Sequence, residues 1–452
     1  MINNIVSKSN KNQEKPYVFK LETGHNLNQY KFYHEMGIVK IHMHNNAGAY
    51  MTSNIGVTLP EQHAKYVVWT LLCLTVLVGM GVDLIAPSLP AIANGLHVPN
   101  SAAKNIIAIY LLGYAFGNFF TGFLTDAWGR QKIIRISLFS FVIVSLLPVF
   151  FPRMDVILLS RILQGITLGS YAVVARSVFS DILPPEKLTR MGTLIGTMWG
   201  LGPVLGPVIG GYLQFYFGWE AGFIFFAIIT FIGFIASFII IPETHFNRHP
   251  LRLKTIKTNL IAVLSNRLFM CIVVLMGLAY SLIIVFNTAG PFLIQNEFHY
   301  SPVFFGHVAL WLGVVFLAST FVCRHFLKKH SVEKLYLFVI HFFFIVTIAS
   351  IISSFFFEKS IILVIIASAL MYFSTGFIFP MSMGKGLSLF RHISGTATAL
   401  MYLINVLITS LVSFIVSFIE VHNNTALIGM YFVLLFCAVI VYWIMPRENK
   451  TN

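Results

Sequence analysis

Asp83 is a carboxylate in the middle of an apolar run, where it could bind a proton or a cation. The run reads VLVGMGVDLIAPSLPAI at 76–92, and 67–103 holds no other Asp, Glu, Lys or Arg. Arg161 is a base in a similar setting, in the run RILQGITLGS at 161–170. Burying such groups in a membrane costs about 2.5–3.5 kcal/mol on insertion scales, so they are functional by default. The alternative is a structural ion pair between the two runs.

The apolar runs predict the helices that position these side chains. Hydrophobic residues make up 57% of the 452 residues and charged residues 10%, whereas a soluble domain carries roughly 25% charged residues. The runs are about 20 residues long, as a membrane-spanning helix requires, and they lack the alternation of a transmembrane barrel. The sequence therefore predicts an all-α polytopic membrane protein with twelve transmembrane helices. We place them at 66–93, 104–125, 131–151, 154–178, 190–215, 220–241, 268–290, 302–323, 333–355, 360–382, 395–419 and 425–445.

The distribution of Lys and Arg predicts the orientation of the chain. With the N-terminus inside, 26 of the 30 Lys and Arg residues fall on the cytoplasmic side. Lys104, Arg153 and Lys359 fall on the other side, and Arg161 falls within a span. Because basic loops stay in the cytoplasm, we expect both termini there and a location in the cell inner (cytoplasmic) membrane. The net charge of +14 then faces anionic lipid, and no nucleic-acid partner is expected.

Polar segments divide the chain into two halves of six spans each. The tail lacks the pattern of a cleavable signal, and Met36 and Met51 offer alternative starts. Neither HMH at 42–44 nor the four cysteines have the ligand spacing of a metal site. We expect a disordered cytoplasmic tail at 1–65, an N-terminal half at 66–241, a basic cytoplasmic loop at 242–267, a C-terminal half at 268–445 and a cytoplasmic C-terminus at 446–452.

The connection between the second and third spans combines glycine with charge. It reads GFLTDAWGRQK, in which Gly122 and Gly129 allow close approach and a tight turn. Asp126 and Arg130 lie at the cytoplasmic rim. The positive-inside rule explains Arg130 at this rim but not Asp126.

The fourth and fifth spans carry small residues at helical spacing. Gly165 and Gly169 form a stripe that allows a neighbouring helix to pack closely, and Arg161 and Gln164 share a face. Glycines repeat every four residues along the fifth span, and this repeat predicts a kinked helix packed closely along its length. Its two ladders and two prolines are Gly192, Gly196, Gly200, Gly202, Pro203, Gly206, Pro207 and Gly210.

These motifs resemble those of the major facilitator superfamily. G-x-x-x-D-x-x-G-R, R-x-x-Q-G and G-P-x-x-G-P-x-x-G-G are similar to its motifs A, B and C. The last is the antiporter motif of its twelve-span drug–proton antiporters, and here it comprises Gly202, Pro203, Gly206, Pro207, Gly210 and Gly211. DLIAPSLP at 83–90 resembles the first-helix signature of the bicyclomycin/chloramphenicol resistance (Bcr/CflA) branch, and IPET, GPFL and SGTATAL also fit it. Ala127 and Gln131 depart from motif A, which has bases there.

The resemblance implies a major facilitator fold, in which two six-helix halves open a central cavity to alternate sides of the membrane. It implies antiport of protons against drugs by a monomer, driven by the proton gradient without a cofactor, and hence antibiotic resistance. Asp83 would bind the proton, the substrate or each in turn, and Arg161 would oppose its protonation. Arg130 would pair with Asp181 to latch the cytoplasmic side, and Asp126 would cap the span that begins near Ser394.

Four further side chains could line the cavity, or could equally be ordinary packing residues. They are Tyr110, Gln164, Trp199 and Asn287. The substrate itself stays open, because the same resemblance allows a specific metabolite or a siderophore. A nutrient uptake symporter is the rival that the antiporter motif argues against. No HExxH, nucleophile or Walker motif occurs, so we expect neither an enzyme nor an ATP-driven pump.

Overall fold

The computed structural model describes residues 20–23, 29–34, 37–42, 61–183, 185–245, 253–390 and 393–446. The chain divides into two units, Met1–Thr58 and Leu59–Asn452. The first unit contains an antiparallel sheet in the order β1-β2-β3. The strands are β1 Lys20–Thr23, β2 Gln29–His34 and β3 Gly37–His42.

This sheet differs from the expectation of a tail without regular structure. β2 and β3 read QYKFYH and GIVKIH, and their aromatic and β-branched residues favour strands. The rest of 1–60 lies outside the described residues, as do 246–252 and 447–452. The cytoplasmic location of the tail stays a prediction.

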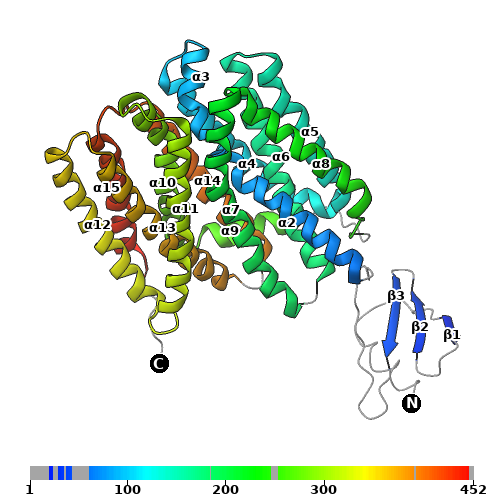
Figure 1. Ribbon diagram of the computed structural model, residues 1–452. Coiled ribbons are helices and arrows are strands. Elements are labelled where there is room, and N and C mark those ends of the chain that lie inside the picture. Colours follow the sequence, from blue (N-terminus) through cyan, green and yellow to red (C-terminus); the bar gives the residue numbers. More distant parts are fainter. Residues whose placement is uncertain are drawn as a thin grey trace. The chain divides into compact units, whose positions relative to one another are not determined.

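The second unit is helical, and among its described residues twelve helical segments are long and apolar enough to cross a membrane. The predicted fold class is therefore confirmed. Figure 1 shows the helices of the N-terminal half and those of the C-terminal half on opposite sides of the unit. The N-terminal half contains α2 Glu61–Asp83, η1 Ala86–Ser88, α3 Leu89–Gly95, α4 Asn100–Trp128, α5 Arg130–Phe150, α6 Met154–Ile182, α7 Pro185–Phe217 and α8 Glu220–Ile240.

The C-terminal half follows a short helix, α9 Leu253–Leu264, that lies within the predicted central loop. Five of its helices begin at a side chain that accepts a hydrogen bond from a backbone N–H of the first turn, as N-caps do. These caps are Asn266, Ser301, Ser331, Ser360 and Asn423. The half contains α10 Arg267–Phe292, η2 Leu293–Glu297, α11 Pro302–Phe326, α12 Val332–Phe356, α13 Ile361–Leu389, α14 Ser394–Ser417 and α15 Asn424–Ile444.

The two halves repeat one packing scheme. In the N-terminal half α2 packs on α7, α4 on α6, and α5 on α8; in the C-terminal half α10 packs on α14, α11 on α13, and α12 on α15. The halves meet mainly through α4 with α14 and α7 with α11. These are corresponding helices exchanged between the halves, as an internal repeat requires.

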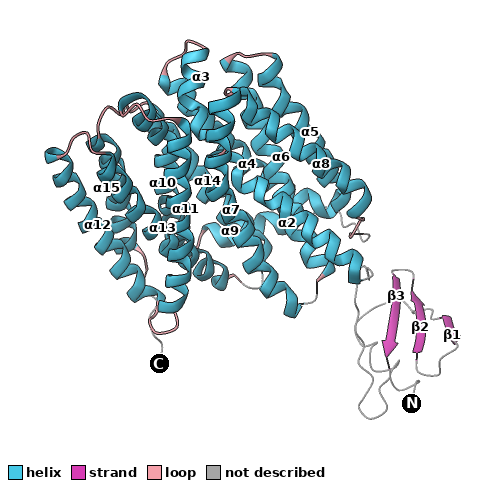
Figure 2. Ribbon diagram, in the orientation of Figure 1, coloured by secondary structure: helices cyan, strands magenta, loops and turns pink. Residues whose placement is uncertain are grey.

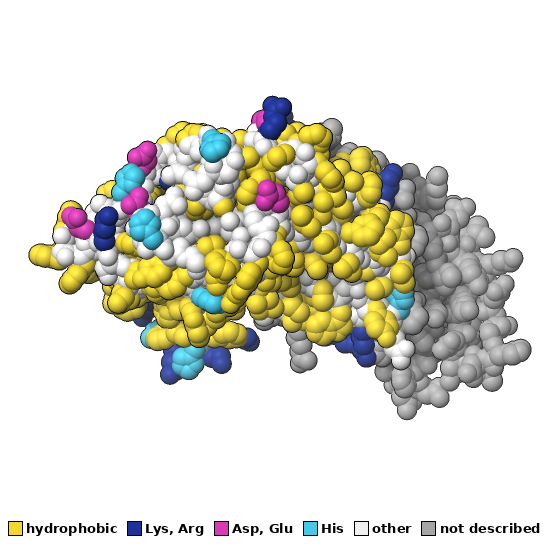
Figure 3. All heavy atoms as spheres, turned by 45° about the horizontal axis from the view of Figure 1, so that its top comes forward, with side chains coloured by type: hydrophobic (Ala, Val, Ile, Leu, Met, Phe, Trp, Pro, Cys, Tyr) yellow, Lys and Arg dark blue, Asp and Glu magenta, His cyan; other side chains and the backbone are white. Residues whose placement is uncertain are grey.

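Many large hydrophobic side chains are exposed on the helical unit, and they cover much of the face shown in Figure 3, as a lipid-facing surface requires. Charged side chains and histidines lie toward its ends (Figure 3). Connections between the helices are short (Figure 2). We call the end that carries η1 the η1 end, and the opposite end, where α4 turns into α5, the Arg130 end.

Candidate functional site

The first membrane span is broken at Asp83, whereas the sequence predicted one continuous helix over 66–93. α2 ends at Asp83, and η1 and α3 continue the span to Gly95. Pro87 explains the break, because it has no N–H to donate to the carbonyl of Asp83 four residues earlier. Asp83 therefore lies where the regular helix stops, yet it is only 2% exposed.

Asn287 of α10 joins Asp83 to the other half. Its Nδ2 donates to Asp83 Oδ1 at 2.6 Å, and its Oδ1 accepts from the hydroxyl of Tyr372 on α13 at 3.5 Å. Asn287 is 1% exposed and Tyr372 2% exposed. The predicted cavity residue Asn287 is thus a buried partner of the carboxylate.

Three tyrosines surround the Asp83 carboxylate closely enough to interact with it electrostatically. They are Tyr110 on α4, Tyr280 on α10 and Tyr372 on α13, so both halves contribute. The Tyr110 hydroxyl packs against Gly81 and, although buried, has no hydrogen-bond partner among the described residues. Tyr280 also contacts Trp199 of α7, with ring centroids 5.8 Å apart.

Arg161 is fully buried but is not the ionic partner of Asp83. Its guanidinium donates to Gly81 O at 2.8 Å, Ile106 O at 3.3 Å and Gln164 Oε1 at 3.0 Å. It also stacks over the Tyr110 ring at 4.1 Å. Among the described residues no ion pair joins it to a carboxylate, so the structural ion pair considered from the sequence is not present. Arg161 instead ties α6 to α2 and α4.

α7 packs against the Asp83 region through its glycines. A Cβ added at Gly202 would meet the backbone at Gly79, and one added at Gly206 would meet Asp83 and Leu84. Gly211 lies equally close to Pro302 of α11. At the Arg130 end, by contrast, a Cβ at Gly192 or Gly196 would meet no described atom within 4 Å. The predicted close packing therefore holds for the part of α7 near Asp83 and not for its beginning.

At the Arg130 end, a tight turn is held by two carboxylates. α4 runs to Trp128 and the turn lies at Gly129, with φ +87°; Gly122 lies inside α4 and makes no turn, contrary to expectation. Arg130 Nε pairs with Asp181 Oδ2 at 3.2 Å. Glu243 accepts from the backbone N–H groups of Arg130 and Gln131 at 2.9 and 3.3 Å, so it caps the start of α5.

Arg130, Gln131 and Asp181 belong to the N-terminal half, and Glu243 follows shortly after its last helix, α8. The Arg130–Asp181 pair joins α5 to α6 and does not bridge the halves, which differs from a latch that would close one half on the other. Gln131, a departure from motif A, donates to Ile241 O at 2.7 Å and so supports the turn in another way. The side chain of Asp126 lies outside the described residues, and its capping role stays a prediction.

Comparison with known proteins decides the family. A profile described as Major Facilitator Superfamily matches residues 71–413. The chain belongs to the major facilitator superfamily. A solved structure described as a D-xylose-proton symporter has the same fold, with TM-score 0.71, 15% identity, and coverage of 86% of this chain and 99% of that chain.

Relatives within the superfamily agree with the predicted branch at low identity. The chain is 24% identical to a "Bicyclomycin resistance protein homolog" of Haemophilus influenzae over 61% of this chain and 70% of that protein. It is 25% identical to "Multidrug resistance protein MdtL" of Salmonella heidelberg over 51% of this chain and 59% of that protein. It is 24% identical to an "Uncharacterized transporter" of Rickettsia bellii over 80% of this chain and 91% of that protein. The chain is thus a multi-pass membrane transporter whose family and relatives are transporters rather than enzymes.

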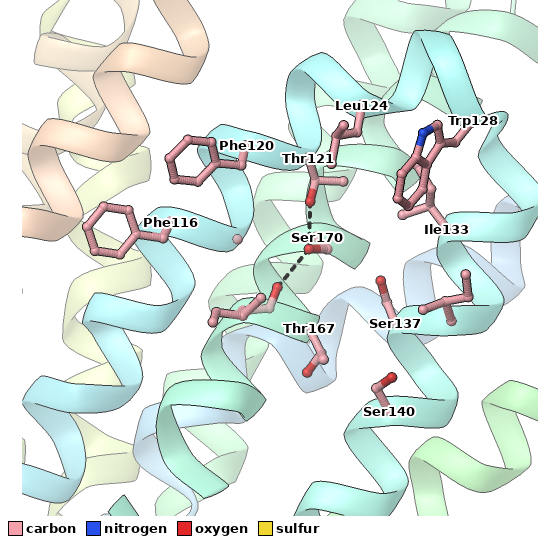
Figure 4. Close-up of a pocket in the computed structure, with 13 residues that line it drawn as sticks. Phe116, Phe120, Thr121, Leu124, Trp128, Ile133, Ser137, Ser140, Thr167 and Ser170 are labelled. Atoms are coloured by element: carbon pink, nitrogen blue, oxygen red, sulfur yellow. Dashed lines mark hydrogen bonds between the residues drawn. The ribbon is translucent and has the colours of Figure 1, made fainter. Parts of the chain in front are cut away.

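A pocket of about 530 Å³ lies away from Asp83, between α4, α5 and α6. Phe116, Phe120 and Trp128 at its edge are substantially exposed, and Thr121 and Ser170 bond to each other inside it at 2.7 Å (Figure 4). Its lining is mostly apolar, and the hydroxyl groups of Thr121, Thr167 and Ser170 already have hydrogen-bond partners. It has the character of a lipid-facing groove, and it contains none of the predicted site residues.

Sequence reasoning missed several residues of the site. Tyr280 and Tyr372 carry no motif, and only the packing of α10 and α13 brings them to Asp83. The charge distribution places Arg176 on the cytoplasmic side, but its side chain stacks over Tyr402 of α14 at 4.8 Å and donates to Asn118 at 3.3 Å. Glu243 belongs to IPET, a segment that resembles the family signature but to which the sequence assigns no role.

Proposed function

We propose that this transporter is a proton-coupled exporter, an H⁺ antiporter that expels drug-like small molecules and prefers lipophilic cations. The observation that carries this proposal is the Asp83 carboxylate, 2% exposed at the contact between the two halves. We further propose that it acts as a monomer in the cell inner membrane, with the η1 end outside and both termini in the cytoplasm.

A single buried carboxylate supports exchange rather than cotransport. Arg161 directs its N–H groups at neutral oxygens, so it leaves the charge of Asp83 without a direct counter-ion. Either a proton or a cationic substrate can neutralise that charge, but the two compete for one group. Each proton that moves inward supplies about 2.3 kcal/mol per 100 mV of membrane potential.

Aromatic side chains support a preference for organic cations. Tyr110, Tyr280 and Tyr372 lie around Asp83, and Trp199 adjoins Tyr280. Aromatic faces attract cations, with an effect that grows to about 2 kcal/mol when the cation is desolvated. The free hydroxyl of Tyr110 would supply one hydrogen bond to a ligand. The names of the bicyclomycin and multidrug resistance relatives support drugs as substrates without indicating their charge.

The test is transport by inverted membrane vesicles that contain wild-type protein or Asp83→Asn. The panel comprises lipophilic cations, neutral drugs, amino acids and siderophores, with a pH-sensitive dye to follow protons. We expect the wild type to accumulate lipophilic cations in the vesicles while protons leave, and Asp83→Asn to lose accumulation against a gradient. Asp155→Asn, which alters an exposed carboxylate at the start of α6, is the control and should transport normally.

Two outcomes would contradict the proposal. A normally expressed Asp83→Asn protein that accumulates substrate at the full rate would remove Asp83 from the coupling. Proton movement in the same direction as the substrate would indicate a symporter. Accumulation of a siderophore or a metabolite alone would keep the antiport and change the substrate class.

A further inference from the structure

The two halves are joined by hydrogen bonds of different chemistry. Gln295 Nε2 donates to Pro87 O at 2.9 Å, Lys104 Nζ to Ile419 O at 2.7 Å, and Ser410 Oγ to Ala108 O at 2.8 Å. Tyr212 lies 3.5 Å from His307 Nε2, and Asn287 donates to Asp83. Of these five, only the Asn287–Asp83 bond ends on a carboxylate.

We propose that Asn287, oriented by Tyr372, is the residue through which the C-terminal half senses the charge of Asp83 and locks the η1 end shut while that carboxylate is ionised and empty. This inference rests on the proposed proton coupling at Asp83. It makes Asn287 and Tyr372 positioning residues for the transport cycle.

The direction of the hydrogen bonds carries the argument. Asn287 Oδ1 accepts from the Tyr372 hydroxyl, so the amide N–H₂ group faces Asp83 and can only donate. An ionised carboxylate accepts such a bond about twice as strongly as a neutral acid does. The Asn287–Asp83 distance of 2.6 Å places the two groups in direct contact. A proton on Asp83 therefore weakens the contact between α2 and α10.

The lock accounts for tight exchange. An antiporter dissipates the proton gradient if the form that carries neither substrate nor proton switches freely between inward-open and outward-open states. The Asn287–Asp83 bond holds that form closed at the η1 end, whereas a proton or a cationic substrate neutralises Asp83 and releases it. The acceptors Pro87 O, Ile419 O and Ala108 O do not change with the charge of Asp83, so they cannot make this distinction.

Other ionisable groups must be separated from Asp83 in the test. Those around it are Tyr110 of α4, Tyr280 of α10 and Tyr372 of α13, while Arg161 of α6 bonds to nearby Gly81. α7 presents Gly206 there. Lys104, Tyr212 and His307 are the other titratable side chains in the five bonds, so Lys104→Gln, Tyr212→Phe and His307→Gln are included as controls.

The experiment measures the distance between spin labels across the η1 end in a cysteine-free background. Labels at Asn94→Cys and Lys359→Cys place one exposed reporter on each half. Double electron–electron resonance is recorded from alkaline to acidic pH without substrate. In the wild type we expect the short, closed distance at alkaline pH and a growing open fraction on acidification. The controls Lys104→Gln, Tyr212→Phe and His307→Gln should keep this pH response.

Asn287→Leu should lower the closed-to-open ratio at alkaline pH by about tenfold or more, because it removes a charge-assisted hydrogen bond. It should also remove most of the pH response. Its flux down a substrate gradient should persist while accumulation against a gradient falls. Tyr372→Phe keeps the ring and should give a smaller change in the same direction. Thr288→Val is the matched control, since it removes a buried bond from the next residue of α10 to Ser413 within one half.

The outcomes separate this inference from the proposed function. If Asn287→Leu or Tyr372→Phe keeps the full pH response while Asp83→Asn loses both the response and export, the lock is wrong and Asp83 coupling stands. If Asp83→Asn also keeps the response and exports at full rate, the proposed function itself fails. An equal change in Thr288→Val would reduce Asn287 to a packing residue and overturn the inference.

Discussion

At the scale of a single residue, the role of Arg161 follows from where its guanidinium N–H groups point. Its guanidinium reaches carbonyl oxygens of Gly81 and Ile106 on two other helices while stacking on Tyr110. Gly81 lies two residues before Asp83, where α2 ends. A planar, forked cation therefore fixes the backbone that carries the carboxylate, rather than neutralising the carboxylate itself.

Replacing Arg161 by Lys tests this role. Lysine keeps the charge but cannot reach separate acceptors with fixed donors, so the export rate should fall by at least about tenfold, as expected for losing hydrogen bonds from a charged donor. The measurement is the initial efflux rate at equal expression, with the exposed Arg153→Lys as the control. Wild-type export by Arg161→Lys would mean that positive charge alone is required.

α7 is the element that sets how close the two halves can come. Its glycines near Asp83 touch the α2 backbone on one side and α11 on the other. Close packing of this kind leaves no room for a side chain, and interiors tolerate added volume poorly. A helix that touches both halves is well placed to transmit a change from one to the other.

Two glycine substitutions on α7 separate close packing from helix propensity. Gly202→Val inserts a side chain against Gly79 and should cost about 1–3 kcal/mol of stability. Gly196→Val makes the same change where no described atom lies within 4 Å, so it should be tolerated. The melting midpoint in detergent compares them, and equal losses would show that the α2–α7 contact is not the cause.

The membrane-spanning helices were easier to predict from the sequence than the breaks within them. Hydrophobic runs and charged loops located all twelve spans, because length and polarity are set locally by the bilayer. The break at Asp83 was missed although Pro87 signals it, since a proline is often tolerated in a membrane helix. Motif residues such as Arg130 and Asp181 could be paired from the resemblance, and the structure brings them to 3.2 Å. Tyr280, Tyr372 and Arg176 could not be placed, because their roles depend on how α10, α13 and α14 pack.

At the scale of the whole transporter, the η1 end is where several contacts across the halves collect. Lys104, assigned to this face from the sequence, is 2% exposed, bonds to Ile419 O and lies over the Phe292 ring at 5.2 Å. Ile419, which accepts the hydrogen bond from Lys104, is followed in the α14–α15 connection by Glu420 and His422. The stability of the contacts between the halves at the η1 end therefore depends on the interactions that fix the α14–α15 connection.

His422 makes this connection sensitive to pH. Its ring nitrogens contact Glu297 at 2.8 Å and Glu420 at 3.1 Å, and these hydrogen bonds raise the pKa of His422 above its ordinary value of 6.5. A group whose pKa is raised by folding stabilises the folded state fully below its unfolded pKa, and this contribution disappears as the pH rises through the folded pKa. The bridge is therefore complete in acid and lost in alkali.

The expected outcome is a pH-dependent difference in thermal stability between the wild type and His422→Gln. The wild type should melt at a higher temperature below about pH 6, and the difference should vanish toward about pH 9, where histidine is neutral. The effect is small, because His422 is 68% exposed and solvent screens the pair. Arg153→Gln, which breaks an exposed pair with Asp155, should show no trend in this window, since neither partner changes charge there. A constant difference at all pH values would mean that His422 stabilises the connection by packing instead of by charge.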